Sequence, residues 1–519
     1  MKARPGPPSD LGVQDWLWWR SGVSPERKAL KFGSVEWTYK DLQEKVGNLS
    51  AHLRHWRIRR GERVALLVQP SETFVALVHA IARVGAVAVP LNHRQSGIEL
   101  LLQLKDSDPS LVVCDEAIGE KVRDKIGPRL WKLTSELDLA SPPRGGEPFR
   151  GDFLDPSALH SIVYTSGSSG VPKGVELTVS NFLWNAVSFG LRNGASADDR
   201  WLLAMPLFHV GGFTVIFRSV LHGSGIVLHR RFEAAPVSRS LDKDEITLAS
   251  FVPTMLADVL ASRAGEPFPS GLRRIFLGGD RPPESLMAKI KDERLPVVLT
   301  YGMTETCSQV ALSPVGAGPS GSREGVVAYQ QVFPSEVAIK SGRKGASKAR
   351  PGEVGEIVVR GPTVFRGYWR NRKMSEASFD GPWFRTGDLG FMRPSANGDE
   401  FALLGRKDDM IISGGEHIYP VEVESSLRGH RAVRDAVVIG RKDERWGQRV
   451  EAVLEIRRDF RLAPPSGSDL DAFLKQRMAS YKVPKRYHFW TVLPRTSSGK
   501  VLREAVRLRL EGKAPGGAG

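Results

Sequence analysis

The residues with the clearest chemical signature form a run of glycines and small hydroxyl side chains after the strand-like segment 161–165. Successive backbone N–H groups in such a loop create an anion-binding concavity, hydroxyls add hydrogen-bond donors and a lysine adds positive charge. It is not a Walker A motif, because Pro172 stands where that motif has its second glycine and Gly174 follows the lysine. A flexible linker is the alternative, but linkers do not usually start directly after a buried strand. The pattern predicts a phosphate-binding loop formed by Thr165, Ser166, Gly167, Ser168, Ser169, Gly170 and Lys173.

A second group of candidate residues lies in YGMTET, residues 301–306, directly after a strand-like segment. The ring of Tyr301 can stack on a flat heterocycle, and the hydroxyl of Thr304 can hydrogen-bond a phosphate. Glu305 offers the hard oxygen ligand that nucleotide-bound Mg²⁺ prefers. Because Tyr and Glu are also common at strand ends without a ligand, this motif alone leaves both interpretations open.

Two charged residues in later motifs could act on the same ligand. The carboxylate of Asp388, in RTGD, can accept hydrogen bonds from two vicinal hydroxyls, although an aspartate beside a glycine more often caps a turn. Lys500 ends the Ser/Gly segment 494–500, and a long cation on such a loop can reach into a cleft and neutralise charge developing at a phosphate. Most lysines are only solvated, so its assignment depends on the surrounding motif.

The chain resembles the adenylate-forming enzymes, the superfamily of acyl- and aryl-CoA synthetases, adenylation domains and firefly luciferases. One such motif is weak evidence, whereas five in the expected order leave little room for chance. The five segments are TSGSSGVPKG (165–174), YGMTET (301–306), WFRTGDLG (383–390), GRKDDMIISGGEHIYPVEVE (405–424) and PRTSSGK (494–500).

The resemblance implies a site for ATP and Mg²⁺, with Glu305 as the metal ligand and Lys500, Thr304 and Glu305 as the catalytic residues. Asp388 would bind the ribose, and Arg406 the ribose and phosphate side of the nucleotide. Gly278 and Gly279 would let the backbone approach adenine closely, whereas Asp280 departs from the small residue that many relatives carry there. The implied ATP-binding residues are the loop residues above together with Gly278, Gly279, Asp280, Tyr301, Gly302, Thr304, Asp388, Arg406 and Lys500.

The resemblance also implies two reaction steps separated by a domain rotation. A carboxylate attacks the α-phosphorus of Mg·ATP to give acyl-AMP and pyrophosphate, and the thiolate of coenzyme A then displaces AMP. The hinge would be Asp408, since a rotation needs only one or two residues whose φ and ψ can change. Gly414 and Gly415 would line the path of the thiol, with an ordinary β-hairpin turn as the alternative.

Three segments resemble the o-succinylbenzoate–CoA ligases of menaquinone synthesis: LGGD (277–280), YGMTETCSQV (301–310) and VFPSEVAI (332–339). The acyl-pocket residues implied are His209 as a gate, for which a structural histidine is the alternative, with Ser308 and Gln309. One departure is VVAYQQV (326–332), which lacks an expected Gly-x-Pro-Leu run. A CoA ligase for another aryl acid, or for a medium- or long-chain fatty acid, therefore stays open.

The composition is that of a multidomain globular protein. The 519 residues are 41% apolar and 25% charged, and a single core rarely exceeds about 250–300 residues. With only Cys114 and Cys307 the chain has no disulfide framework, and its start lacks the apolar stretch of a signal peptide, so we expect a cytoplasmic protein. The most apolar run, residues 74–91, is interrupted by charged residues, Gly and Pro, so no membrane span is expected.

The net charge of +16 also admits a nucleic-acid-binding protein. Its basic residues are interspersed with apolar ones and form no block of like charge, so we expect no nucleic-acid partner. A polyanionic small ligand would suit the same field. An adenylation domain that charges a carrier protein is a further alternative. The oligomeric state is open, a homodimer included.

Short β-rich runs alternate with helical ones from Val64 onwards, which favours an α/β fold with parallel-rich sheets, flanking helices and a β subdomain. The smaller, mobile C-terminal domain would be α+β. We predict an N-terminal AMP-binding domain at 1–404, a hinge at 405–409, the mobile domain at 410–511 and a disordered tail at 512–519.

Overall fold

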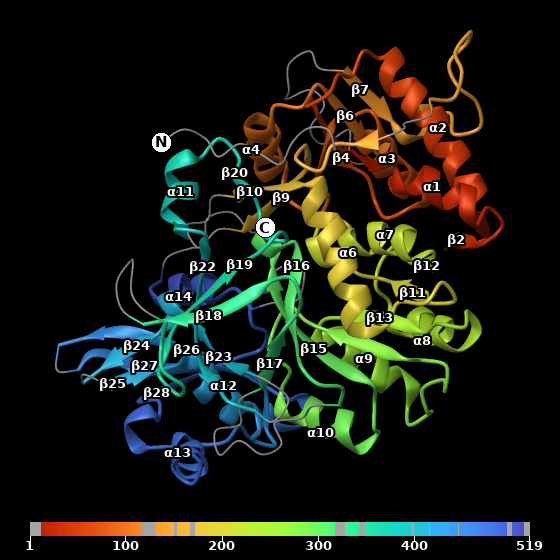
Figure 1. The fold of residues 1–519 in the computed structure, drawn as a ribbon. Helices are drawn as coiled ribbons and strands as arrows, with labels where there is room; N and C mark the ends of the chain where they lie inside the picture. Colours follow the sequence, from red (N-terminus) through yellow and green to blue (C-terminus); the bar gives the residue numbers. More distant parts are fainter. Residues whose placement is uncertain are drawn as a thin grey trace.

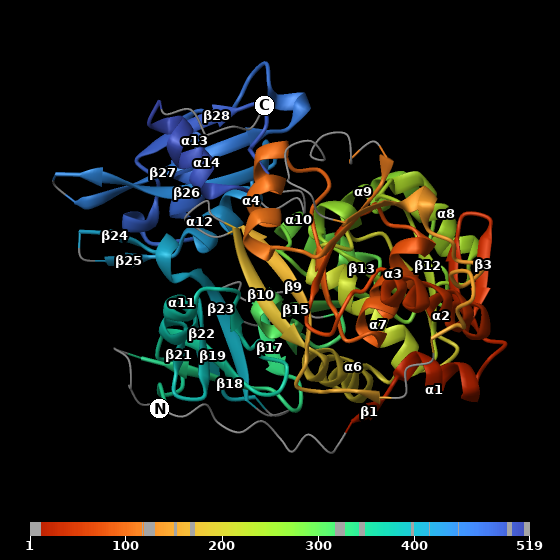
Figure 2. The same cartoon turned by 90° about the horizontal axis from the view of Figure 1, so that it is seen from above.

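The computed structural model describes residues 12–116, 118, 130–149, 153–166, 172–316, 327–341, 348–395, 399–414, 416–444, 446–495 and 501–512. Its elements fall into two groups. The N-terminal and central elements, red to teal in Figure 1, form most of the molecule, and the blue C-terminal elements gather on one side of it. Figure 2, viewed from above, shows the same separation.

The first sheet has a parallel core. β4 lies between β5 and β6, and β9 and β7 extend the parallel arrangement on either side. The chain then reverses from β9 into β10 as an antiparallel hairpin. The order across this sheet is β20 (Gly367–Tyr368), β10 (Pro172–Thr178), β9 (Leu159–Ser166), β5 (Val87–Pro90), β4 (Arg63–Leu67), β6 (Leu111–Cys114) and β7 (Leu130–Leu133).

The second sheet is larger and changes from parallel to antiparallel at β15. Its parallel part includes β14 (Arg274–Leu277) and β15 (Val297–Met303), and its antiparallel part contains the β subdomain. The order is β18 (Glu336–Lys340), β19 (Gly355–Arg360), β22 (Trp383–Arg393), β23 (Glu400–Arg406), β17 (Ala328–Gln331), β16 (Ser308–Leu312), β15 (Val297–Met303), β14 (Arg274–Leu277), β13 (Leu248–Phe251), β11 (Arg200–Leu203), β12 (Gly225–Leu228), β2 (Lys28–Phe32) and β3 (Val35–Thr38), with β21 (Phe379–Asp380) paired to β22.

A third sheet contains the C-terminal strands and has its own apolar core. Along the chain, the last strand of the second sheet is β23, which ends at Arg406. The short 3₁₀ helix η4 (Lys407–Asp409) links it to β24 of the third sheet. We call the residues up to Arg406 the large domain and those from Met410 onwards the C-terminal domain. The order is β25 (Glu416–Ile418), β24 (Ile411–Ser413), β27 (Gly447–Ile456) and β26 (Val433–Asp443), with β28 (Arg486–Trp490) paired to β27.

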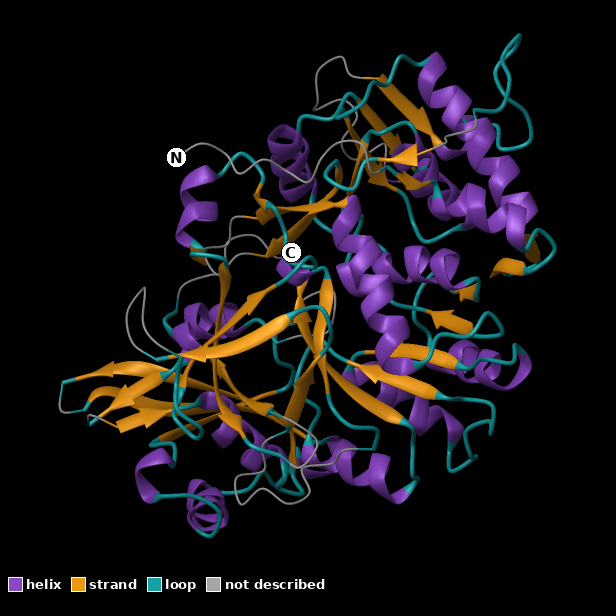
Figure 3. Cartoon of the chain, in the orientation of Figure 1, coloured by secondary structure: helices purple, strands orange, loops and turns teal. Residues whose placement is uncertain are grey.

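Helices flank these three sheets (Figure 3). A separate two-stranded sheet pairs β1 (Val13–Gln14) with β8 (Phe153–Leu154). Side-chain caps fix where several begin; in α6, Thr178 accepts from the backbone N–H of Asn181, whose side chain caps the backbone of Thr178 in return. No helix in the described ranges is long and apolar enough to cross a bilayer. The helices are α1 (Trp16–Val23), α2 (Tyr39–His55), α3 (Glu72–Arg83), α4 (Gly97–Ser107), α6 (Val179–Asn193), α7 (Val210–His222), α8 (Ala234–Lys243), α9 (Pro253–Arg263), α10 (Glu284–Asp292), α11 (Arg372–Ala377), α12 (Pro420–Arg428), α13 (Gly467–Lys475) and α14 (Arg503–Leu510).

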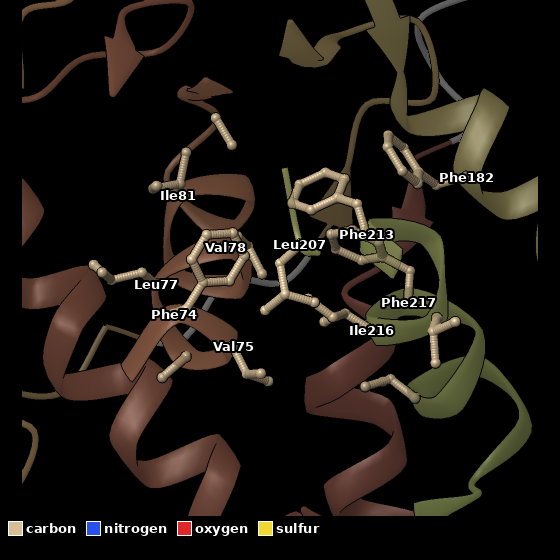
Figure 4. Close-up of a cluster of buried hydrophobic side chains, with 14 of the residues drawn as sticks. Phe74, Val75, Leu77, Val78, Ile81, Phe182, Leu207, Phe213, Ile216 and Phe217 are labelled. Atoms are coloured by element: carbon tan, nitrogen blue, oxygen red, sulfur yellow. The ribbon is translucent and has the colours of Figure 1, made fainter. Parts of the chain in front are cut away.

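The main core lies where α3 meets α6 and α7 (Figure 4). Phe74 of α3 and Phe213 of α7 meet edge to face, with ring centroids 6.4 Å apart. Phe217 and Phe182 continue the cluster at 4.8 Å. Because members of this core also come from strands of both large sheets, the two sheets share one continuous apolar core that can position a site at their edges.

Two buried histidines lie in the same aromatic cluster. The ring of His160 is 4.5 Å from Phe182 and 4.7 Å from Phe217, and His79 is 5.3 Å from Phe217. Burial lowers the pKa of His79 to about 4 and that of His160 to about 3. Both rings are therefore neutral in the folded chain at pH values where an unfolded histidine is already charged.

We expect the chain to lose stability on mild acidification. Since the folded pKa values lie below the unfolded value, the unfolded state binds more protons below about pH 6.5, and each histidine removes about 2 kcal/mol by pH 5. Urea midpoints at pH 7.5 and pH 5 measure the loss. Between the two pH values, His160→Leu should lose less free energy of unfolding than the unaltered chain. The control His55→Gln, at an exposed position, should lose as much as the unaltered chain. An unchanged acid dependence in His160→Leu would contradict this expectation.

Candidate active site

A cavity of about 280 Å³ lies between the large domain and the C-terminal domain. The parallel strands β14 and β15 both end at it, as expected for a ligand site at the carboxyl edge of such a sheet. The C-terminal domain contributes α12 and the start of α14 to its wall. The predicted ATP-binding residues that line it are Gly279, Asp280, Tyr301, Gly302, Asp388 and Arg406.

A hydrogen-bonded group of three side chains stands in this cavity. The hydroxyl of Tyr301 donates to Asp388 Oδ2 at 2.9 Å, and Arg406 Nη1 lies 3.1 Å from Asp388 Oδ1. Burial raises the pKa of Tyr301 well above its usual range, and the Asp388 carboxylate adds to this, so the phenol keeps its proton. Asp388 is thus a carboxylate oriented at the cavity wall by two hydrogen-bond donors.

The ring of Tyr301 is held by other aromatic rings. Its centroid is 5.5 Å from that of Phe401 and 6.0 Å from that of Tyr329. Tyr301 and Tyr329 both also line the cavity. The predicted stacking of Tyr301 on adenine stays a prediction, with Tyr329 as a second aromatic surface beside it.

Two of the predicted glycines lie where a neighbouring strand leaves no room for a Cβ atom. A Cβ at Gly278 would lie 2.2 Å from Thr300 Oγ1, and one at Gly302 would lie 1.9 Å from the carbonyl oxygen of Ser308. Gly279 has a φ of +86°, which disfavours other residues. Close strand approach and a left-handed turn therefore explain these glycines before any ligand is considered.

Tyr368, which the sequence motifs did not indicate, joins two predicted residues. Its hydroxyl donates to Glu305 Oε1 at 2.9 Å, and Lys173 Nζ stands 5.8 Å from its ring centroid. Lys173, the second residue of β10, pairs with Thr165 of β9, so both flank the predicted phosphate loop. Glu305 and Thr304 lie in the short 3₁₀ helix η3 (Thr304–Thr306) after β15. The predicted metal ligand Glu305 and the predicted phosphate-binding Lys173 therefore both lie next to the side chain of Tyr368.

Some predicted residues lie outside the described ranges: Gly167, Ser168, Ser169, Gly170, Gly415, Lys500 and the side chain of Ser166. Lys500 has described neighbours on the C-terminal side. Val501 and Arg503 both line the cavity. The described residues that directly follow Lys500 in the sequence therefore lie at the wall of the cavity of about 280 Å³.

The predicted acyl-pocket residues lie at the contact between α7 and β16. His209 immediately precedes α7, and burial lowers its pKa to about 4, which keeps the imidazole neutral. Ser308 and Gln309 begin β16, and Gln309 is buried. Ser308 has a φ of +82°, an unusual value for a residue with a side chain.

A buried arginine next to this pocket was not predicted. Arg218 of α7 donates from Nε to Asn185 Oδ1 at 2.7 Å, and Asn185 donates to the carbonyl oxygen of Cys307 at 2.6 Å. Within the described ranges no carboxylate stands within ion-pair distance of Arg218, and its Nη2 is buried without a hydrogen-bond partner. A buried guanidinium without a counter-ion is costly, so a ligand carboxylate would suit it. Only its place on a strongly apolar helix could have indicated it.

The predicted hinge residue Asp408 and Gly414, one of the two residues predicted to line the path of the thiol, lie in connections between strands. Asp408 is exposed in η4, between strands of different sheets. Gly414 turns β24 into β25 with a φ of +59°, and a Cβ there would lie 2.9 Å from the ring of Trp446. The hairpin alternative thus accounts for Gly414 locally, and its role beside a thiol stays a prediction.

Comparison with known proteins places the chain in a family. Residues 17–369 match the AMP-binding enzyme family, and residues 422–500 match the AMP-binding enzyme C-terminal domain. The chain belongs to the AMP-binding enzyme family. It is 38% identical to the 2-succinylbenzoate–CoA ligase of Bacillus licheniformis over 494 residues, covering 95% of this chain and 99% of that protein. The predicted resemblance and enzyme class, an acid–CoA ligase, are confirmed.

The family likeness extends to the three-dimensional structure. O-succinylbenzoate coenzyme A synthetase from Bacillus subtilis, solved with ATP and magnesium ion, is 34% identical with a TM-score of 0.86, over 96% of this chain and all of that one. A double mutant of that enzyme bound with the product analogue OSB-NCoA is 35% identical over 96% and 98%, with a TM-score of 0.71. The fold class is confirmed, and the overall similarity is greater to the ATP complex than to the complex with the product analogue.

Proposed function

We propose that the chain is an AMP-forming acid–CoA ligase that acts on 2-succinylbenzoate in menaquinone synthesis. In the first step a carboxylate oxygen of the acid bonds to the α-phosphorus of ATP and pyrophosphate leaves. In the second the thiolate of coenzyme A bonds to the acyl carbon and AMP leaves. The observation that carries the proposal is the Tyr301–Asp388–Arg406 group in a cavity at the carboxyl ends of β14 and β15, in a chain with full-length ligase relatives.

The nucleotide would bind with its ribose hydroxyls on Asp388, whose oxygens Tyr301 and Arg406 already orient. Such pre-orientation removes an entropic cost from the bound state. Adenine would lie beside Gly279, Tyr301 and Tyr329. Thr304 and the loop between Thr165 and Lys173 would contact the phosphates, and Lys500 would neutralise charge on the α-phosphate as the carboxylate attacks.

The residues present fit Mg²⁺ that arrives with ATP. Within the described ranges no group of three or more His, Cys, Asp or Glu could hold an ion alone. Mg²⁺ in nucleotide sites is typically held by one or two carboxylates together with the substrate's phosphates, and Glu305 offers one such carboxylate. The ion would supply charge neutralisation at the phosphates, and Tyr368 would hold Glu305 in place.

The acyl substrate is supported by Arg218 as well as by the relatives. 2-Succinylbenzoate carries two carboxylates; one is activated, and the other must be accommodated in the acyl pocket. Arg218 is a buried cation that Asn185 links to the carbonyl oxygen of Cys307, the residue before Ser308, and among the described residues no protein carboxylate is its counter-ion. A dicarboxylic acid matches this charge, whereas a plain fatty acid leaves it unpaired.

Acid-dependent pyrophosphate release tests the proposal. The full chain is incubated with Mg·ATP and 2-succinylbenzoate, benzoate or octanoate, with and without coenzyme A, and thioester is measured in parallel. We expect 2-succinylbenzoate to be preferred by at least about 100-fold in kcat/KM, because the alternatives leave a buried cation unpaired. A preference for benzoate or octanoate would overturn the substrate, and no pyrophosphate release with any acid would overturn the ligase function.

Tyr368→Phe separates the two contacts of Tyr368. The ring under Lys173 remains, but Glu305 loses a hydrogen-bond donor, so we expect the Mg²⁺ concentration for half-maximal adenylation to rise about tenfold. Titration of Mg²⁺ at saturating ATP measures this. Tyr368→Leu also removes the ring and should raise KM for ATP in addition. If Mg²⁺ dependence in Tyr368→Phe equals that of the unaltered chain, Glu305 is not held by this contact.

A further inference from the structure

Asp280, the departure from the expected motif, faces the C-terminal domain. It follows β14, is exposed, and lines the cavity of about 280 Å³ between the two domains. It also lines a second cavity of about 50 Å³. Arg428 of α12 lines both cavities as well, so Asp280 and Arg428 stand together at the boundary between the two domains. Helix α10, just after Asp280, contacts α12 (Figure 2).

The surface opposite Asp280 is a network of charges formed by the C-terminal domain together with Asp409 of the linker η4. Arg428 Nε lies 2.7 Å from Asp435 Oδ1, and Arg503 Nε lies 3.2 Å from Asp409 Oδ2. Glu424 joins both arginines. Burial lowers the pKa of Arg428 and of Arg503, but the surrounding carboxylates, Asp280 among them, raise both above the usual value. Asp280 is therefore close enough to add to the field at two arginines of the other domain.

The two sets of contacts respond differently to a domain rotation. Arg428, Glu424, Asp435 and Arg503 belong to the C-terminal domain and move together. Asp280 belongs to the large domain, so its attraction to the arginines exists only in the present orientation. In this orientation Val501 and Arg503, which follow Lys500 in the sequence, line the cavity of about 280 Å³.

We propose that Asp280 is an electrostatic latch that holds the C-terminal domain, through Arg428 and Arg503, in the orientation that presents the chain around Lys500 to the nucleotide. This inference rests on the proposed two-step function. Asp280 is thus a positioning residue for adenylation. It favours the first step over the second, because thioester formation requires the latch to open.

Asp280→Asn in the full chain tests the latch, since it keeps the shape and removes the charge. Solvent screens the exposed carboxylate of Asp280, so we expect single-turnover acyl-AMP formation to slow only about fivefold, while thioester formation from preformed acyl-AMP is unchanged or faster. The difference in the rate of acyl-AMP formation between Asp280→Asn and the unaltered chain should become smaller at high salt. Asp280→Glu should restore most of the rate, and Asp292→Asn, exposed on the neighbouring α10, should change neither step.

A measurement without substrate keeps the latch separate from the ligase proposal. Spin labels at Ser262→Cys on α9 and Ser468→Cys on α13, both exposed, report the distance between the domains. Asp280→Asn should broaden this distribution or add a second distance. An unchanged distribution, an equal loss in both steps, or a raised KM for ATP alone would overturn the latch. If no acid is activated by the unaltered chain, the ligase proposal fails while the label distances still decide whether Asp280 holds the domains.

Discussion

Lys500→Ala is expected to slow acyl-adenylate formation by about 10²–10³-fold and to leave thioester formation from preformed acyl-AMP largely intact. Removing one preorganised cation aimed at charge that develops in a transition state costs an effect of this size. The charge on the α-phosphate develops only in the first step, so the second step should not need the lysine. Pyrophosphate release in the absence of coenzyme A and thioester yield from supplied acyl-AMP measure the two steps.

A matched variant separates this effect from a general loss of positive charge. Lys475→Ala removes an exposed lysine of α13, whose only described ion pair is with Asp471 at 4.0 Å on the same helix. It should leave both steps unchanged. Equal losses in both steps of Lys500→Ala would falsify the assigned role and indicate a structural lysine.

Asp408→Pro should give the opposite pattern: acyl-AMP accumulates and thioester formation falls by at least about 100-fold. Proline fixes φ at about −65° and restricts the preceding residue as well. A hinge that must change its φ and ψ in η4 can then no longer supply the second orientation. Acyl-AMP and thioester are measured separately in the same reaction.

Asp408→Ala is the control for this variant. Alanine removes the carboxylate but leaves the backbone free, so turnover should stay within a few-fold of that of the unaltered chain. If Asp408→Pro turns over normally, the rotation does not pass through this residue. If Asp408→Ala is as impaired as Asp408→Pro, the carboxylate matters and the backbone does not.

The motifs and most of the elements were predictable because their signals are local in the sequence. Residues 63–114 alternate apolar β-rich and helical runs, and the structure has β4, α3, β5 and β6 there. Pro420 begins α12, as its fixed φ predicts. The turns after β14 and β15 were recognisable because glycines follow apolar strands, and both turns reach the cavity.

The partners of the site residues were not predictable, because contacts between distant segments leave no periodic trace. The hydroxyl of Tyr301 reaches a carboxylate 87 positions away, and Tyr368 reaches Glu305 across 63. From the sequence alone, Arg218 is one charge on an apolar helix; only the packing shows that none of the residues the structure describes provides a counter-ion for it. The significance of Asp280 also depended on the domain packing, which brings it to Arg428.

By itself, the sequence determined the family, the enzyme class and the order of the chemical groups along the chain. These depend on residue type and spacing, which a linear chain records. The tertiary structure alone decided which side chains hold those groups in place, which charges lie buried, and how the two domains face one another. Such features arise from burial and from distances between remote segments, and both exist only once the strands and helices have packed.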